Sequence, residues 1–307
     1  MVKILITGGA GFIGSSLCDQ LIKRSYFVYI LDNLSTGKKT NIPNHKNVKF
    51  INVDVNNKVK LISKTKNLKI DYIFHFAACV GVLRTLNNPL VVLNDINGFK
   101  NIFSLSKSKK IKRIFFSSSS EVYGEGKGYA QNEEKTPLNS RLTYAVVKNI
   151  GESFCKAYLK EYKINYTIFR FFNTYGPKQS SDFVISKFLK QAKSNKKITI
   201  YGNGRQSRTF CYIDDTTKAI VNCLTKRLYI NNTVNIGNNK VVNMYKLANI
   251  IKDISNSKSK IVFVKALKEG DMLTRKPDIK KMKKLLNTEY ISLSSGIKTI
   301  LNQYDKK

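Results

Sequence analysis

The first 32 residues contain the pattern that most limits how this chain can fold: a strand, a glycine-rich turn and a helix in direct succession. Residues 3–7 form a short, largely β-branched run of the kind found in buried parallel strands. Gly8, Gly11 and Gly14 follow at intervals of three, and residues 15–24 then carry apolar side chains at helical spacing. The glycines allow a tight turn, close approach of backbone N–H groups to a diphosphate, and close packing of the helix. Since a helix N-terminus attracts phosphate, the pattern predicts a dinucleotide site.

The next strand supports this interpretation and indicates which dinucleotide is bound. Residues 26–31 predict a second strand, which ends at Asp32. An acid placed about 20 residues after the glycines can accept hydrogen bonds from ribose hydroxyls and repels a 2′-phosphate. NAD is therefore favoured over NADP. The nearby positive charges of Lys38 and Lys39 would attract a 2′-phosphate and so weaken this preference.

Strands and helices continue to alternate, which predicts an α/β fold with a doubly wound parallel sheet of the Rossmann type. After residue 175 the pattern loosens, and we expect a smaller C-terminal α/β substrate lobe. The predicted division is residues 1–175 for the NAD-binding domain, with some later segments returning to it, and residues 176–307 mainly for the substrate lobe. The expected strands are 48–53, 71–76, 113–117 and 165–169, and the expected helices are 58–66, 89–107, 144–162, 184–193, 214–225, 243–254 and 278–286.

Composition narrows the possible partners and the compartment. The chain of 307 residues has 54 Lys and Arg against 20 Asp and Glu, a net charge of +34. Such a charge suits nucleic acid or an anionic membrane, but the lysines are spread over nearly every segment, which indicates a generally basic surface instead. No apolar run reaches membrane-spanning length, so we expect no membrane partner. Five scattered cysteines without a CxxC pair indicate a reducing, cytoplasmic location, and two histidines argue against a metal site.

Tyr144 and Lys148 are the strongest candidates for catalysis. They lie four residues apart at the start of a predicted helix, so both side chains project from one face. A phenol is a poor base at neutral pH, but a neighbouring ammonium and a positively charged nicotinamide favour the phenolate. Tyr144 could then take a proton from a sugar hydroxyl while hydride leaves the same carbon. Four serines at positions 117–120 close the strand before this helix, where ligands bind in such sheets.

These motifs, taken in order, resemble the extended short-chain dehydrogenase/reductase family, in its nucleotide-sugar epimerase/dehydratase branch. The resemblance runs almost end to end. It rests on TGGAGFIG at 7–14, DNLSTG at 32–37, HFAA at 75–78, SSSEVYG at 118–124, Tyr144 with Lys148, RFFNTYGP at 170–177 and YGNGRQSRTF at 201–210.

The resemblance implies a role for each matched residue. Ser119 corresponds to the catalytic serine or threonine, and Tyr144 corresponds to the base. Lys148 corresponds to the residue that binds the ribose and lowers the pKa of the tyrosine. Glu121 is a further catalytic candidate. Ser119 is also implied as a substrate contact, and the residues implied for the nucleotide diphosphate or base are Asn173, Tyr201, Arg208 and Arg275. Those implied for NAD are Gly8, Gly11, Phe12, Ile13, Gly14, Asp32, Asn33, Leu34, Ser35, Thr36, Gly37, Asp54, Val55, Phe76, Ala77, Ala78, Asn94, Tyr144, Lys148 and Phe172.

The reaction itself is less constrained. Members of the family oxidise the sugar at C4, after which the 4-keto sugar epimerises, eliminates water or loses carbon dioxide. Ser120 stands where 4,6-dehydratases carry an acid, which argues against that branch. Glu121 and RKPDI at 275–279 resemble UDP-glucuronate decarboxylases, whereas HFAACVGV at 75–82 and a short segment after Pro177 resemble 4-epimerases. We expect a UDP-glucose 4-epimerase-like enzyme, with a decarboxylase-like or dehydratase-like lyase as the alternative.

Two further expectations concern partners. The resemblance implies a homodimer built through a helix bundle that includes the Tyr144 helix, and a nucleoside-diphosphate sugar, most simply a UDP-sugar, as substrate. A rival hypothesis, motivated by the charge, is a basic nucleotide- or RNA-binding Rossmann protein without turnover. A binder has no need of Ser119, Tyr144 and Lys148 together, so nucleic acid is not the expected partner.

Overall fold

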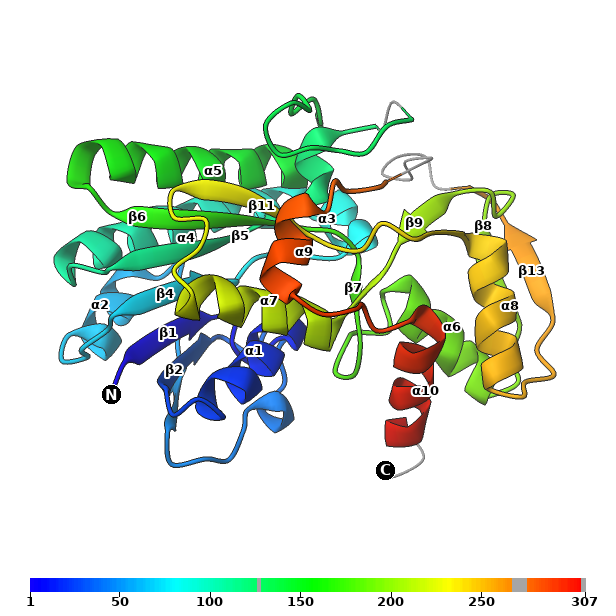
Figure 1. Cartoon of the computed structure of the whole chain (residues 1–307). Coiled ribbons are helices and arrows are strands. Elements are labelled where there is room, and N and C mark those ends of the chain that lie inside the picture. Colours follow the sequence, from blue (N-terminus) through cyan, green and yellow to red (C-terminus); the bar gives the residue numbers. More distant parts are fainter. Residues whose placement is uncertain (126–127, 267–274, 305–307) are drawn as a thin grey trace.

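The computed structural model describes residues 1–125, 128–266 and 275–304. Within these residues, the centre of the molecule is a seven-stranded parallel sheet (Figure 1). Its strands are β1 (Lys3–Thr7), β2 (Phe27–Asp32), β3 (Val48–Asn52), β4 (Tyr72–His75), β5 (Arg113–Ser119), β6 (Asn165–Phe171) and β11 (Asn232–Ile236). They lie in the order β11-β6-β5-β4-β1-β2-β3. Their runs of aliphatic and aromatic residues suit strands that are covered on both faces.

The strand order reverses beside β1, and this reversal positions the site. The chain leaves β1 toward β2 and β3 on one side, then crosses back to β4 on the other, where Thr7 pairs with His75. Beyond it, β5 pairs with β4 and β6 pairs with β5, with Ser119 opposite Phe171. Ligands bind outside the carboxyl ends of parallel strands at such a switch point. The segments that follow β1, β4 and β5 therefore meet at one edge of the sheet.

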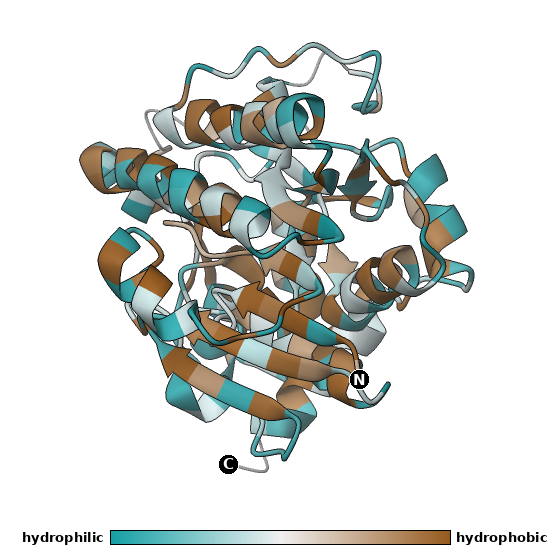
Figure 2. Cartoon of the chain, turned by 90° about the vertical axis from the view of Figure 1, so that its left-hand side faces the viewer, coloured by the Kyte–Doolittle hydropathy of each residue, from teal (hydrophilic) through white to brown (hydrophobic). Residues whose placement is uncertain are grey.

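Helices cover both faces of the sheet. One layer contains α2 (Lys58–Thr65), α4 (Pro89–Ser108) and α5 (Thr143–Tyr162), with the short α3 (Val82–Asn87) against α4 and α5. The other contains α1 (Phe12–Ile22), α7 (Ile213–Thr225) and α9 (Lys280–Leu286). The helices of each layer pack on the sheet and form a separate hydrophobic core with it. The strands are mostly apolar and the covering helices alternate apolar and polar residues, as Figure 2 shows.

The smaller lobe adjoins the carboxyl edge of the sheet. It holds three two-stranded sheets, which pair β7 (Thr174–Tyr175) with β10 (Cys211–Tyr212), β8 (Ile198–Tyr201) with β13 (Ile261–Val264), and β9 (Ser207–Thr209) with β12 (Val241–Asn243). Helices α6 (Val184–Lys193), α8 (Met244–Ile254) and α10 (Leu293–Tyr304) pack with them around a third core. Phe12 and Ile13, at the start of α1, pack against this core, so the glycine turn lies where the two lobes meet.

The predicted doubly wound sheet and the smaller C-terminal α/β lobe are confirmed, while the boundary at residue 175 and substrate binding by the small lobe stay predictions. Segments after that boundary do return to the larger domain: β11 pairs with β6, α7 packs on α1, and α9 packs on α7. Two short 3-10 helices, Lys39–Asn41 and Ser120–Tyr123, complete the elements near the site.

Candidate active site

In the turn between β1 and α1, Gly8 and Gly14 lie too close to neighbouring backbone to carry a side chain. Gly8 has a φ of +68°, and a Cβ placed on it would lie 2.7 Å from the backbone N of Ala77. A Cβ on Gly14 would collide with the carbonyl oxygen of Gly8. Gly11 is the N-cap of α1, so the first-turn N–H groups of Phe12 and its neighbours face the turn without intrahelical partners. These N–H groups and the turn at Gly8, Gly11 and Gly14 form a glycine cradle that fits the diphosphate of NAD.

Asp32 lies at the carboxyl end of β2, where the adenosine ribose is expected. One carboxylate oxygen accepts from the Ala10 N–H at 3.0 Å and the other from the Leu34 N–H at 2.8 Å. Each oxygen keeps acceptor capacity for a ribose hydroxyl. Asn33 donates to Asp54 at 3.0 Å, which ties the loop after β2 to the segment after β3. The other residues predicted for this half of NAD lie in the same two segments: Ser35, Thr36, Gly37 and Val55.

The segment after β4 is fastened to β1. The N–H groups of Phe76 and Ala77 both donate to the Thr7 hydroxyl oxygen at 3.1 Å, and Ala78 follows. That hydroxyl must donate its own proton to Nδ1 of His75, 2.7 Å away, so Nε2 carries the imidazole proton. Burial lowers the pKa of His75 to about 3 and keeps the ring neutral. The bonds hold the predicted NAD contacts of this segment beside the glycine turn.

Tyr144, Lys148 and Ser119 come together where β5 ends against the start of α5. Ser119 is the last residue of β5, and its hydroxyl accepts from the Glu121 N–H at 3.2 Å and lowers the pKa of the Tyr144 phenol. The Lys148 ammonium lies 5.7 Å from the centre of the Tyr144 ring and donates to the Ser117 carbonyl at 2.8 Å. The structure therefore brings together the three groups that the sequence singled out.

The pKa of Tyr144 differs from the expectation of an easily formed phenolate. Burial, and then the nearby Glu121 carboxylate, raise the pKa of Tyr144 above its usual value, and only the hydrogen bond from Ser119 opposes them. Burial also lowers the pKa of Lys148 to about 8, because a buried ammonium is poorly solvated. In the protein alone the pair is thus shifted away from phenolate and ammonium. The correction follows from desolvation, which the spacing of residues in a sequence does not report.

Glu121 forms an ion pair inside this site. Its Oε1 lies 2.7 Å from Nη1 of Arg275, and both side chains are nearly buried. Its other oxygen, Oε2, is buried and has no hydrogen-bond partner among the residues that the structure describes. A buried acceptor without a partner is costly, so it is a natural contact for a bound hydroxyl group.

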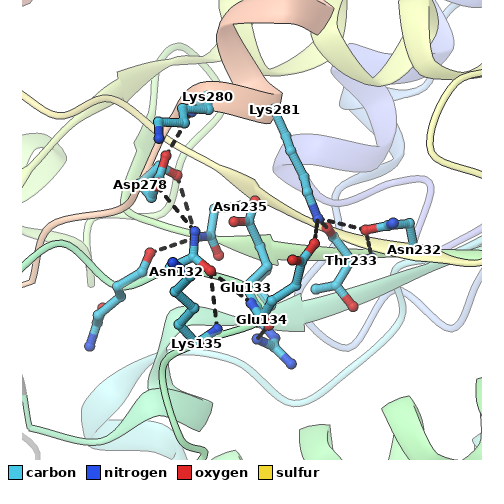
Figure 3. Close-up of polar contacts among 12 residues, drawn as sticks. Asn132, Glu133, Glu134, Lys135, Asn232, Thr233, Asn235, Asp278, Lys280 and Lys281 are labelled. Carbon is cyan, nitrogen blue, oxygen red and sulfur yellow. Dashed lines mark hydrogen bonds and ion pairs between the residues drawn. The ribbon is translucent and has the colours of Figure 1, made fainter.

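The segment that carries Arg275 is fastened to the loop that precedes α5. Gln131 N–H donates to the Lys276 carbonyl and the Asp278 N–H donates back to Gln131, both at 2.8 Å, which makes a parallel β-bridge beside Pro277. Figure 3 shows the polar contacts that continue this attachment. Asn132 donates to the Asp278 carboxylate at 3.1 Å, and the Lys281 ammonium reaches Glu134 at 3.0 Å, Asn232 at 2.7 Å and the Thr233 carbonyl at 3.0 Å.

A buried charge network adjoins the serines that end β5. Glu152 is fully buried on the same face of α5 as Tyr144 and Lys148, and it binds Arg170 through both oxygens at 2.7 and 2.9 Å. The Ser118 hydroxyl donates to the same carboxylate at 2.6 Å. The network joins α5, β5 and β6, so it fixes the helix that carries the base against the strand that carries Ser119. The motifs quoted above do not reveal this role of Glu152.

The residues predicted for the nucleotide lie on the small lobe. Asn173 donates to the Thr209 carbonyl at 3.1 Å. Tyr201 is the last residue of β8, and the Lys187 ammonium lies 4.6 Å from the centre of its ring. Arg208 is the middle residue of β9. Asn173 lies between β6 and β7, whereas Tyr201 and Arg208 belong to two separate strands. Their contact with a nucleotide stays a prediction.

Two predicted NAD contacts, Asn94 and Phe172, differ in exposure, and their contact with NAD stays a prediction. Asn94 is exposed on α4, whereas the neighbouring Asp95 is half-buried and accepts from the Cys79 N–H at 2.9 Å. Helical spacing explains this difference, because residue 95, and not 94, shares a face with the buried residues 92, 99 and 102. Phe172 is 1% exposed and packs with Val122 and Tyr123, which directly follow Glu121 in the chain.

The doubly wound sheet, the glycine cradle and the Tyr144–Lys148 helix define an extended short-chain dehydrogenase/reductase. Comparison with known proteins specifies this further, because residues 4–237 match the model of the "NAD dependent epimerase/dehydratase family". The chain belongs to this family.

Individual relatives are similar over nearly the whole chain. A Methanocaldococcus jannaschii protein with a provisional name as a UDP-glucose 4-epimerase is 37% identical over 305 residues, covering 97% of each chain. UDP-glucuronic acid decarboxylase 1 of Xenopus tropicalis is 32% identical, covering 99% of this chain and 72% of the relative. The crystal structure of UDP-glucuronic acid 4-epimerase from Bacillus cereus, in complex with UDP-glucuronic acid and NAD, is 32% identical with a TM-score of 0.89 and covers 99% of each chain.

The family membership makes this protein an enzyme that uses NAD, and the glycine cradle and Asp32 fit that cofactor. Within the described residues, no helix is both long and apolar enough to cross a membrane. The same part of the chain contains no group of three or more His, Cys, Asp or Glu side chains that could hold a metal ion.

Proposed function

We propose that this protein is a UDP-sugar 4-epimerase of the cytoplasm. The observation that carries the proposal is the grouping of Ser119 at the end of β5 with Tyr144 and Lys148 at the start of α5, where the Lys148 ammonium lies 5.7 Å from the centre of the Tyr144 ring. The names of the similar proteins support a UDP-sugar as substrate.

In the proposed reaction, the residues of this chain hold the sugar and move one proton. Bound NAD supplies the acceptor and later the donor of the hydride at C4. Tyr144 takes the proton of the C4 hydroxyl and returns it after the 4-keto sugar has turned its other face, while the Ser119 hydroxyl hydrogen-bonds the same sugar oxygen. The Lys148 ammonium favours the phenolate, and so does the positive charge of an oxidised nicotinamide. Asn173, Tyr201, Arg208 and Arg275 would hold the nucleotide diphosphate, for which guanidinium groups are geometrically suited.

The test is incubation with UDP-glucose, UDP-N-acetylglucosamine, UDP-glucuronate and dTDP-glucose, followed by mass analysis and chromatography of the products. A new epimer of unchanged mass supports the proposal. Tyr144→Phe should lower kcat by roughly 10²- to 10⁴-fold, because the proton acceptor is lost, while NAD(H) still copurifies. Near-normal turnover by this variant would rule out Tyr144 as the base. A protein that lacks NAD(H), turns over no sugar and binds RNA in a salt-sensitive way would instead support the RNA-binding rival.

A second candidate, a UDP-glucuronate decarboxylase, is favoured by the Glu121–Arg275 pair and by the decarboxylase relative. Loss of carbon dioxide from UDP-glucuronate would identify it, and loss of water would identify a dehydratase. The substitution Glu121→Gln further distinguishes an epimerase from a lyase. An epimerase should keep most of its kcat, whereas a lyase that uses this carboxylate should lose roughly 10²-fold or more. Exposed Glu161 on α5 provides the matched control, Glu161→Gln.

We also propose that the protein is a homodimer formed through α4 and α5. Apolar side chains on these helices are exposed in the single chain: Leu90 is 76%, Val91 52%, Leu93 42% and Val146 42% exposed. Such neighbouring apolar groups mark an interaction surface more often than a free one. The family resemblance specifies a second copy of this chain as the partner.

A further inference from the structure

Residues 176–183, here called the strap, join β7 to α6 in the small lobe and also contact the larger domain. Gln179 holds the strap to its own lobe, because its side-chain amide donates to the Thr174 carbonyl at 2.7 Å and accepts from the Ser186 hydroxyl at 3.2 Å. Residues 180–183 are exposed, so this part of the strap lies on the surface of the protein. Two ion pairs then fix where the strap runs.

The first ion pair joins the strap to α1. The Lys178 ammonium lies 2.8 Å from the Asp19 carboxylate and 3.5 Å from the Asn41 carbonyl oxygen. The side chain of Asn41 in turn donates to the carbonyl of Ala10, in the turn between β1 and α1, at 3.0 Å. This end of the strap therefore lies near the glycine cradle, in the helix layer that contains α1.

The second ion pair joins the strap to the opposite helix layer. The Arg84 guanidinium donates to the Asp182 carboxylate at 3.2 Å. Arg84 belongs to α3, which follows the segment after β4 and packs against α4 and α5. Asp182 is only four residues after Lys178, and four residues span at most about 14 Å. The strap therefore takes the short route between the two layers, across the carboxyl edge of the sheet where NAD is expected to lie.

We propose that the strap is a cover over the NAD site, held closed by the Lys178–Asp19 and Arg84–Asp182 ion pairs, and that its opening limits the release of NAD. The proposal needs only the use of NAD, which membership of the family establishes, and it holds whichever sugar is converted. The charged side chains of both pairs are partly exposed, so each pair contributes modestly to closure. Loss of either pair should lower the free energy of opening and speed the release of NAD.

The test compares Asp19→Asn, Asp182→Asn and Asp71→Asn, each of which removes one carboxylate from an ion pair. The Asp71–Lys112 pair, 2.8 Å long, is the matched control, because its residues directly precede β4 and β5 at the opposite edge of the sheet. Protein loaded with radiolabelled NAD is diluted into excess unlabelled NAD without any sugar, and the retained label is counted over time. Asp19→Asn and Asp182→Asn should each release NAD roughly two- to five-fold faster than the native protein, and Asp71→Asn at the native rate.

The direction of the change separates the ion pairs from the general charge of the protein. Each substitution removes a negative charge, and a more positive protein attracts the anionic diphosphate of NAD more strongly, which by itself slows release. Faster release in Asp19→Asn and Asp182→Asn therefore reports the loss of the pairs. The difference from the native protein should also shrink in about 1 M salt, because screening weakens the exposed pairs that the native protein retains.

Unchanged or slower release in either Asp19→Asn or Asp182→Asn, or equal acceleration in Asp71→Asn, overturns the proposal. An acceleration that is the same at low and high salt does so too, and so does exchange of NAD by the native protein within the time of mixing, because the strap then retains nothing. The measurement involves no sugar, so failure of the proposed epimerase reaction would leave its outcome unaffected.

Discussion

At the scale of single residues, buried polar side chains organise this site. Glu152 and Arg170 are 0% and 3% exposed and bind each other through two hydrogen bonds. Because Ser118 shares the same carboxylate, the pair connects the helix of the base to the strand of the catalytic serine. Removing one member of such a pair leaves a charge buried without compensation, which costs more than the pair itself contributes.

We therefore expect Glu152→Gln to lower the free energy of unfolding by about 3 kcal/mol or more, since Arg170 would then lie buried opposite a neutral amide. Chemical denaturation measures the change. Glu161→Gln, at an exposed position of the same helix, should change the free energy by less than about 0.5 kcal/mol. Equal effects of the two substitutions would show that the Glu152–Arg170 pair does not stabilise the fold.

At the scale of elements, the site is assembled from segments far apart in the sequence. The β-bridge between Gln131 and Pro277 holds the Arg275 segment on the loop before α5, and the contacts in Figure 3 extend that attachment to α9 and β11. As a result Arg275 reaches Glu121 although 154 positions separate them (275 minus 121). The segment that carries Arg275 is thus tied to the same loop that leads into α5.

At the scale of the whole molecule, a large positive charge coexists with exposed apolar side chains on α4 and α5. The net charge of +34 opposes association of two copies at long range, but salt at physiological strength screens it beyond about 8 Å. Burial of the exposed apolar side chains acts at contact and is not screened.

We accordingly expect a dimer in physiological salt, measured by light scattering after size-exclusion chromatography. The double substitution Leu90→Glu with Leu93→Glu should shift the protein to a monomer, because it places carboxylates in an apolar contact. Val59→Glu with Ile62→Glu, on exposed positions of α2, is the matched control and should leave the dimer intact. A native monomer, or equal dissociation by both pairs of substitutions, would contradict the proposed α4–α5 interface.

The sequence by itself determined the doubly wound sheet, the glycine cradle, Asp32, and the grouping of Ser119, Tyr144 and Lys148. These features depend on local spacing: a strand period, a helix period, and glycines where backbone must approach backbone. Only the tertiary structure decided that Phe172 packs with Val122 and Tyr123 and that Glu121 pairs with Arg275. It alone also decided the ionisation of Tyr144 and Lys148, because desolvation depends on everything that packs around a group, and that packing comes from segments distant along the chain.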